Sequence, residues 1–216
     1  MLPPLAELGR LSLREQALAA LRRAISSGSI QPGTRMVEAD LSTQLGISRG
    51  TLREAMRQLQ QDGLLEADAR GRLSVRQIGH AEIVDIFLVR GALEALAVRT
   101  ICGFGDREPA LAAVRTALEG MSVPTQEQIA ERIEADLEFH RTLVRASGNG
   151  TLLHQWTQLE GSIRMSIMFA GAERALRNMD VDRHREIVDA IEAGDGDEAA
   201  RVLREHMHEA ATTLIG

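Results

Sequence analysis

The segment between residues 38 and 65 constrains the fold of this chain more than any other. Apolar residues recur there at spacings of three and four, which is typical of helices and not of strands. Leu41 belongs to the apolar face of a first short helix, and Leu52 and Leu59 belong to that of a second. Gly46 lies between the two patterns, where a tight turn is expected. The segment is therefore predicted to form a helix-turn-helix.

The predicted second helix begins with the side chains that a DNA-reading helix needs. Ser48 is a suitable N-cap, because its side chain can accept a hydrogen bond from a free backbone N–H. Arg49, Thr51 and Arg53 follow within the first two turns. The start of a recognition helix meets base edges and phosphates in the major groove, and guanidinium and hydroxyl groups suit both. An ordinary helical hairpin with a solvated charged face is the alternative interpretation.

The neighbouring segments extend the pattern to a winged helix-turn-helix. A helix is predicted over residues 11–27, before the helix pair, and short strands over 64–66 and 73–75, after it. The loop between these strands contains Gly71, which permits positive φ, and the flanking Arg70 and Arg72, which can reach toward a phosphate backbone. A basic two-stranded hairpin directly after a recognition helix is typical of a DNA-binding wing.

Charge divides the 216-residue chain into two parts. Residues 1–78 carry eleven arginines against eight carboxylates, a net +3, whereas residues 79–216 carry fourteen against twenty-three, a net −9. We therefore predict a DNA-binding domain over 1–78 and a second domain over 79–216. No apolar run approaches membrane-spanning length. The single cysteine, Cys102, excludes an internal disulfide and fits a reducing cytoplasm.

The second domain shows only helical patterns, with glycine-containing breaks between them. The fold class is therefore mainly α, with an N-terminal winged helix-turn-helix and a C-terminal antiparallel six-helix bundle. The six predicted helices cover residues 81–102, 107–119, 125–147, 151–169, 182–193 and 196–213.

Four ionisable residues fall on apolar helix faces of this bundle. Asp136 and His140 lie four residues apart on one helix, and His184 and His206 lie on two others. Buried side chains of this kind are costly unless they are paired or share an ion. Three imidazoles and one carboxylate suit a divalent metal such as Zn, Ni, Mn or Fe(II). A hydrogen-bonded polar core is the alternative.

Three further charged residues are candidates for a pocket. Arg90 and Glu94 form an i, i+4 pair that either is exposed and weakly stabilising or points inward. Arg164 is equally open to both interpretations.

At the level of motifs, the chain resembles GntR-superfamily transcription regulators of the FadR branch, with an FCD-type, VanR-like effector domain. The N-terminal motifs are Gly28-Ser29-Ile30-Gln31-Pro32-Gly33, Glu38-x-x-Leu41, Leu45-Gly46-Ile47-Ser48-Arg49 and Leu52-Arg53-Glu54-Ala55. The C-terminal motifs are Arg90-x-x-Leu93-Glu94, Asp136-x-x-Phe139-His140, Ser147-Gly148-Asn149, His184-x-x-Ile187 and Gly194-Asp195 followed by His206.

The resemblance implies a homodimeric regulator, a repressor in our interpretation, that binds an inverted-repeat operator and responds to a small carboxylate. It implies DNA contacts at Arg35, Arg49, Thr51, Arg53 and Gly71. It implies metal ligands at Asp136, His140, His184 and His206. We expect Arg90, Glu94, Asn149 and Arg164 to serve the effector. Many members have Thr-Pro where this chain has Gly50-Thr51, and alanine where it has Ser42, so the operator sequence does not carry over.

A metal-dependent hydrolase or lyase is the rival hypothesis, because three histidines and an aspartate with open metal positions also form catalytic sites. Such an enzyme needs a general base near the metal, and Glu94 is the one clear candidate in the sequence. The winged helix-turn-helix would then have no purpose.

Overall fold

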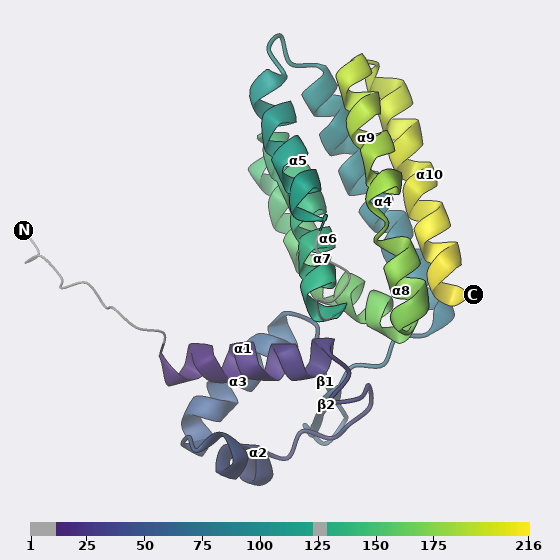
Figure 1. The fold of residues 1–216 in the computed structure, drawn as a ribbon. Coiled ribbons are helices and arrows are strands. Elements are labelled where there is room, and N and C mark those ends of the chain that lie inside the picture. Colours follow the sequence, from purple (N-terminus) through teal and green to yellow (C-terminus); the bar gives the residue numbers. More distant parts are fainter. Residues whose placement is uncertain (1–11, 123–128) are drawn as a thin grey trace, which may run out of the picture.

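The computed structural model describes residues 12–122 and 129–216. These residues form ten helices and one two-stranded sheet, which confirms the predicted mainly-α fold. Figure 1 shows an upright bundle of helices standing on a smaller group of helices that carries the hairpin.

Three helices and a hairpin make up the N-terminal part, in the predicted order. They are α1 (Leu13–Ser26), α2 (Glu38–Leu45), α3 (Arg49–Gln61), β1 (Leu65–Ala67) and β2 (Leu73–Val75). Helix α1 packs against α3, and α2 packs against α3 from another side. Leu52, Met56 and Leu59 supply the buried face of α3. Gly46 ends α2 with a φ of 63°, so the predicted turn uses glycine for its left-handed conformation.

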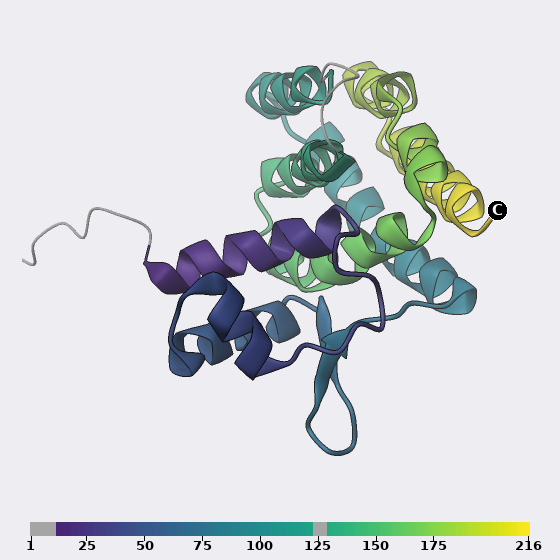
Figure 2. The same cartoon turned by 60° about the horizontal axis from the view of Figure 1, so that its bottom comes forward.

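The hairpin pairs its strands antiparallel, with Leu65 opposite Val75 and Ala67 opposite Leu73. The first strand begins one residue later than predicted. Arg35 forms a bridge to Ser74, which places the segment before α2 beside the second strand. The hairpin projects away from the helices in Figure 2.

The C-terminal part contains α4 (His80–Cys102), α5 (Glu108–Gly120), α6 (Ile129–Ala146), α7 (Gly150–Phe169), α8 (Ala172–Asn178), α9 (Val181–Ala193) and α10 (Gly196–Ile215). Six of these correspond to the predicted helices. Residues 125–128, where the third predicted helix was to begin, lie outside the described residues. In the described part of the chain, no helix is long and apolar enough to cross a membrane.

Helix α8 corrects the predicted count of six. It has seven residues, which is too short for an apolar stripe to be recognised, and a helix of this length is not stable alone. Its position depends on packing against α6, α7 and α10. Tertiary contacts therefore make this segment helical, whereas the sequence pattern predicted only a connection between two helices.

A close backbone contact joins the bundle to the N-terminal part. Gly161 in α7 lies so near Asp62, at the end of α3, that a Cβ at Gly161 would overlap the Asp62 carbonyl oxygen. Next to it, Arg76 Nη1 donates a hydrogen bond of 2.7 Å to Ser162 Oγ, and Arg76 also pairs with Glu82 of α4. Only glycine fits at position 161, because any side chain would push α7 away from α3.

The substitution Gly161→Ala tests this contact. The added methyl group cannot fit, and overpacking of this kind costs about 1–3 kcal/mol unless the two parts separate. We expect separation to release Arg76, so that trypsin cleaves the variant after Arg76 faster than it cleaves the wild type. Gly150→Ala is the matched control, since it adds the same methyl group to α7 where nothing lies within 4 Å. Equal cleavage rates in all three proteins would contradict the described contact.

Candidate functional site

Two hydroxyl groups fix the start of α3. Ser48 is the N-cap, and its Oγ accepts a hydrogen bond of 3.1 Å from the Thr51 backbone N–H. The same oxygen lies 2.9 Å from Thr51 Oγ1. Both predicted DNA-contacting hydroxyls are thus engaged in the cap, although Ser48 remains exposed. Their structural role is to hold the first turn of α3.

The two predicted base-reading arginines have different surroundings. Arg49 is exposed and makes no hydrogen bond or ion pair with any residue that the structure describes. Arg53 lies one turn later and forms a two-bond ion pair with Glu38 of α2. Its Nε lies 3.0 Å from Glu38 Oε1, and its Nη2 lies 2.7 Å from Oε2. The sequence pattern predicted Arg53 but not its partner.

The tip of the hairpin is held by one carboxylate. Asp68 Oδ1 accepts hydrogen bonds from the backbone N–H groups of Arg70 and Arg72, at 2.8 and 2.9 Å. Asp68 Oδ2 also pairs with Arg72 Nε at 2.5 Å. Gly71 has a φ of 72°, and the space around its Cα is open.

Among the described residues, the Arg70 guanidinium has no ion-pair partner. It therefore joins the exposed Arg35 and Arg49 as an available cation on this side of the protein. The sequence pattern predicted that both arginines flanking Gly71 reach toward a phosphate backbone, and in the described part of the chain the structure leaves Arg70, not Arg72, without an ion pair.

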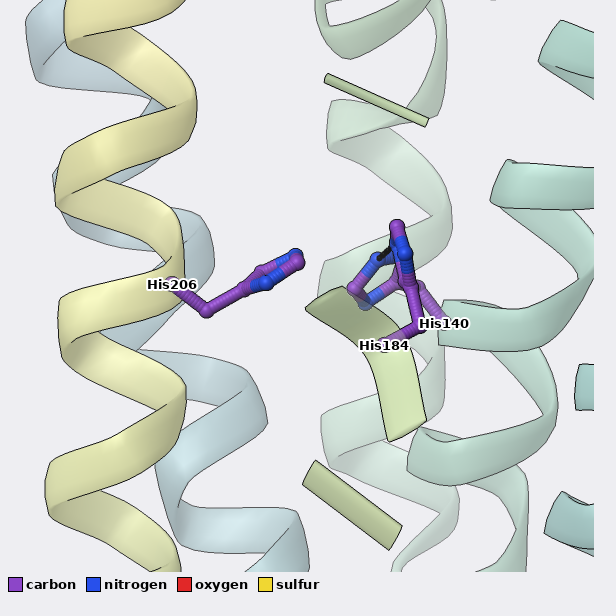
Figure 3. A group of neighbouring side chains, drawn as sticks. All are labelled: His140, His184 and His206. Atoms are coloured by element: carbon purple, nitrogen blue, oxygen red, sulfur yellow. Dashed lines mark hydrogen bonds between the residues drawn. The ribbon is translucent and has the colours of Figure 1, made fainter. Parts of the chain in front are cut away.

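Three of the four predicted metal ligands, the histidines, form one cluster in the bundle, and the fourth, Asp136, lies beside His184. Figure 3 shows His206 extending from α10 toward His140 on α6 and His184 on α9, and one ring nitrogen of each lies within 4.8 Å of the others. His140 Nε2 lies 3.1 Å from His184 Nε2, and Asp136 Oδ1 also lies 3.1 Å from His184 Nε2. All four side chains are buried.

Hydrogen bonds on the far side of two rings orient this group. His184 Nδ1 donates to the Asp180 carbonyl oxygen at 2.7 Å, and His140 Nδ1 donates to Glu94 Oε2 at 2.7 Å. Each Nδ1 therefore carries a proton, and each Nε2 points to the centre. Burial, followed by the charge of Arg90, lowers the pKa of His140, so its ring is neutral. Burial and the other two histidines lower the pKa of His206 strongly.

These separations fit ligands of one metal ion. Two ligand atoms at right angles and about 2.1 Å from a metal lie about 3.0 Å apart. The outer hydrogen bonds to Glu94 and Asp180 are those that orient histidine ligands in metal sites. The donor set thus fits a divalent metal.

Glu94 connects this group to two further helices. It is fully buried, and Oε1 accepts hydrogen bonds from Arg90 Nε at 2.8 Å and Trp156 Nε1 at 2.7 Å. Burial by itself would raise the pKa of Glu94, but the His140 and Arg90 side chains that donate hydrogen bonds to it outweigh burial and lower the pKa to about 2. The Arg90–Glu94 pair is therefore internal, and the exposed-pair interpretation is wrong.

Two buried polar atoms in this region have no hydrogen-bond partner in the described structure, Arg90 Nη2 and Asp136 Oδ2. They face each other across 3.9 Å. Unsatisfied buried groups are rare and mark a place where a ligand, ion or water belongs. Arg90 Nη2 thus offers a cationic donor that lies 3.9 Å from Asp136 and makes no hydrogen bond with the described residues.

Two predicted effector residues lie elsewhere. Asn149 is exposed and caps α7, accepting a hydrogen bond from the Leu152 N–H at 3.0 Å. Arg164 is buried, but it pairs with Glu134 and Glu160 on the side of the bundle toward α1 and α3. Neither is brought to the histidines. The structure places Trp156 there instead, which no motif had indicated.

The geometry also bears on the enzyme hypothesis. Glu94, the one candidate general base, already accepts hydrogen bonds from three buried donors. A carboxylate in this position orients other residues and is not free to take a proton from a substrate.

Comparison with known proteins identifies the family. The family model for bacterial regulatory proteins of the gntR family matches residues 13–75, and the FCD domain model matches residues 85–209. A relative from Paenarthrobacter nicotinovorans, named as probable D-xylose utilization operon transcriptional repressor, is 31% identical over 93% of this chain and 88% of its own length. The gluconate operon transcriptional repressor of Bacillus licheniformis is 24% identical over 92% and 84%.

Solved structures agree. A candidate GntR transcriptional regulator from Rhodococcus sp. RHA1 has a TM-score of 0.74 at 25% identity, covering 95% of this chain and 99% of that one. McbR/YncC of E. coli shares the fold, with a TM-score of 0.71 at 22% identity and coverage of 95% and 98%. The chain therefore belongs to the GntR family of bacterial transcriptional regulators, with a DNA-binding gntR region followed by an FCD domain, and its relatives are regulators and not enzymes.

Proposed function

We propose that this regulator is a homodimeric repressor that binds an inverted-repeat operator and is controlled by a small carboxylate bound at a divalent metal. The two functional units are residues 1–78, which read DNA, and residues 79–216, which bind the effector and the second subunit. The repressor names of relatives from two organisms support the direction of control. Since the operator lies on the chromosome, the protein acts in the cytoplasm.

The DNA-reading surface consists of the first turns of α3 and the hairpin tip. Arg49 and Arg53 would contact bases and phosphates in the major groove, while Arg35, Arg70 and Arg72 would contact the backbone beside it. The net charge of +3 over residues 1–78 supports this assignment, whereas the bundle is acidic.

The observation that carries the metal proposal is the convergence of Nε2 atoms and a carboxylate at 3.1 Å separations. Asp136, His140, His184 and His206 would hold Zn, Ni, Mn or Fe(II). When bound, the metal supplies positive charge that attracts an anion. Arg90 adds a second positive group through Nη2, which makes no hydrogen bond in the described structure, so a small carboxylate is the effector class that this site favours.

Helix α7 is the element that would connect the effector site to DNA binding. Trp156 donates to Glu94 beside the histidines, and Gly161 contacts the end of α3. Five residues separate them, which is about 7–8 Å along a helix. A ligand that changes the hydrogen bonds of Glu94 would thus shift the same helix that holds the recognition helix. By linkage, such an effector must bind the DNA-bound protein less tightly if it weakens operator binding.

The face of α4 that is exposed in one chain supports dimerisation through the bundle. Val84, Leu88 and Leu96 are 43%, 72% and 49% exposed, although α4 is also apolar on its buried side. Helices that are apolar all round are normally covered on both sides. A groove of about 190 Å³ between α4 and α10, with Gly91 on its floor, lies beside Leu88 and would accept the same residue from a second copy.

The substitution Arg49→Ala tests the DNA-reading surface. Loss of one arginine–guanine contact costs about 1–3 kcal/mol, so we expect at least a fivefold loss of operator affinity in a gel-shift or anisotropy titration. Arg185→Ala removes the same charge from an exposed position on α9 and is expected to bind normally. Equal affinity of Arg49→Ala and the wild type would remove α3 from the proposed interface.

The substitution His184→Ala tests the metal site. Elemental analysis of protein purified without chelators or a metal-affinity tag should give about one metal per wild-type chain and a large loss in the variant. Chelation should also lower the melting temperature of the wild type, because the metal binds the folded bundle. His154→Ala changes an exposed histidine on α7 and should keep the metal. Metal-free wild-type protein whose melting temperature does not respond to Zn, Ni or Mn would reduce the cluster to a polar core.

The substitution Leu88→Arg tests the dimer. Burying a leucine contributes about 1.5–3 kcal/mol, so placing a charge there should raise the dimer dissociation constant by tenfold or more in sedimentation velocity. Leu176→Arg, at a 39% exposed position on α8, should leave the dimer intact. A Leu88→Arg variant that remains as dimeric as Leu176→Arg would exclude this face.

A further inference from the structure

An acidic residue occupies the surface that is proposed to meet DNA. Glu38 is the first residue of α2, and both of its carboxylate oxygens are bonded to Arg53 of α3, at 3.0 and 2.7 Å. Arg53 lies one turn after Arg49, on the side of α3 opposite the buried Leu52 and Leu59. The pair thus joins the two helices of the helix-turn-helix at its exposed side.

Stability does not explain this pair. The Arg53 and Glu38 side chains are 54% and 34% exposed, and exposed ion pairs contribute little to folding. Near DNA the carboxylate is also unfavourable, since it repels phosphates and cancels one of the few positive charges of this domain. A role in recognition would account for an acid at this position.

The geometry of the pair leaves a defined part of Arg53 free. A guanidinium group has five N–H donors. Glu38 accepts from Nε and from one N–H of Nη2, which is the side edge of the group. The end edge, formed by Nη1 and the second N–H of Nη2, keeps two parallel donors. Guanine presents two acceptors, O6 and N7, to such a pair of donors in the major groove.

We propose that Glu38 is a positioning residue that determines specificity, because it fixes the Arg53 guanidinium with its end edge available to a guanine. Arg49 has no such support, so Arg53 would be the more selective of the two arginines. The proposal rests on the proposed placement of α3 in the major groove.

The ion pair contributes selectivity because it prevents Arg53 from contacting phosphates instead of a base. A free arginine on a helix surface can rotate to a neighbouring phosphate, which binds every sequence equally. With its side edge held by Glu38, Arg53 loses rotamer freedom before DNA arrives and pays less entropy on contact with a base. Glu38 therefore favours the operator over other DNA, although its charge disfavours DNA in general.

The experiment compares two DNA probes. The first is a duplex selected from a random library by the wild-type dimer, and the second is a scrambled duplex of the same composition. We expect Glu38→Gln to weaken binding to the selected duplex and to leave unchanged or strengthen binding to the scrambled one, since a repulsive charge is lost. The ratio of the two affinities should fall by about tenfold.

Two further variants separate positioning from charge. Asp40→Asn removes the same charge from an exposed position on the same helix, where the aspartate has no ion pair with described residues. It should shift both affinities equally. In a double-mutant cycle, Glu38→Gln should have little effect on the ratio once Arg53 is alanine, because Glu38 holds only Arg53 by hydrogen bonds and affects Arg49 only through its charge. Melting curves check that all variants fold.

Three outcomes are distinguishable. A rise in affinity for the selected duplex in Glu38→Gln would mean that Glu38 sequesters Arg53, which overturns the proposal. Equal shifts in Glu38→Gln and Asp40→Asn would also overturn it, since charge alone would then explain both. If wild-type protein enriches no sequence from the library, the proposed operator binding fails and not the role of Glu38.

Discussion

The hydrogen bonds of the Glu94 carboxylate hold the centre of the bundle together. One buried group on α4 accepts from Arg90 on its own helix, His140 on α6 and Trp156 on α7. Removal of such a partner leaves buried donors unsatisfied, which costs more than the hydrogen bonds themselves contribute. The same carboxylate sets the tautomer of His140 and so directs the Nε2 of that ring toward His184. The packing of the bundle and the proposed ligand binding therefore depend on one side chain.

Charge is used in opposite ways in the two halves of the molecule. In the bundle, the polar cluster is buried, and local electrostatics are strong because water is excluded. On the exposed face of α3, charges are solvated, contribute little to stability and remain available for a polyanion. The Glu38–Arg53 ion pair is exposed like the other charges of α3, but its two hydrogen bonds fix the orientation of the Arg53 guanidinium. Helix α7 contributes Trp156 to the buried cluster, and its Gly161 contacts the backbone of Asp62 at the end of α3.

Periodicity and motif spacing were sufficient for most of the fold. The stripes of apolar residues predicted nine of the ten described helices, and the glycine and capping residues placed most of their ends within two positions. The sequence also predicted that Asp136, His140, His184 and His206 face one interior, because each lies on an apolar helix face and an uncompensated charge there is costly. The spacing of residues along a helix determines which face each of them occupies. This is sufficient to predict that the four side chains point toward the interior.

Pairing between helices was decided by the tertiary structure. The i, i+4 spacing of Arg90 and Glu94 fitted a surface pair as well as a buried one, and only the packed bundle brings Trp156 to the same carboxylate. Arg164 faces inward but at a height that places it near the N-terminal part, and Asn149 is used as a cap. The Glu38–Arg53 pair and the fit of Gly161 against Asp62 depend on how far each helix is rotated and shifted. By itself, the sequence determined which side chains face the interior, whereas packing decided which of them meet, because contact depends on the relative height and rotation of separate helices.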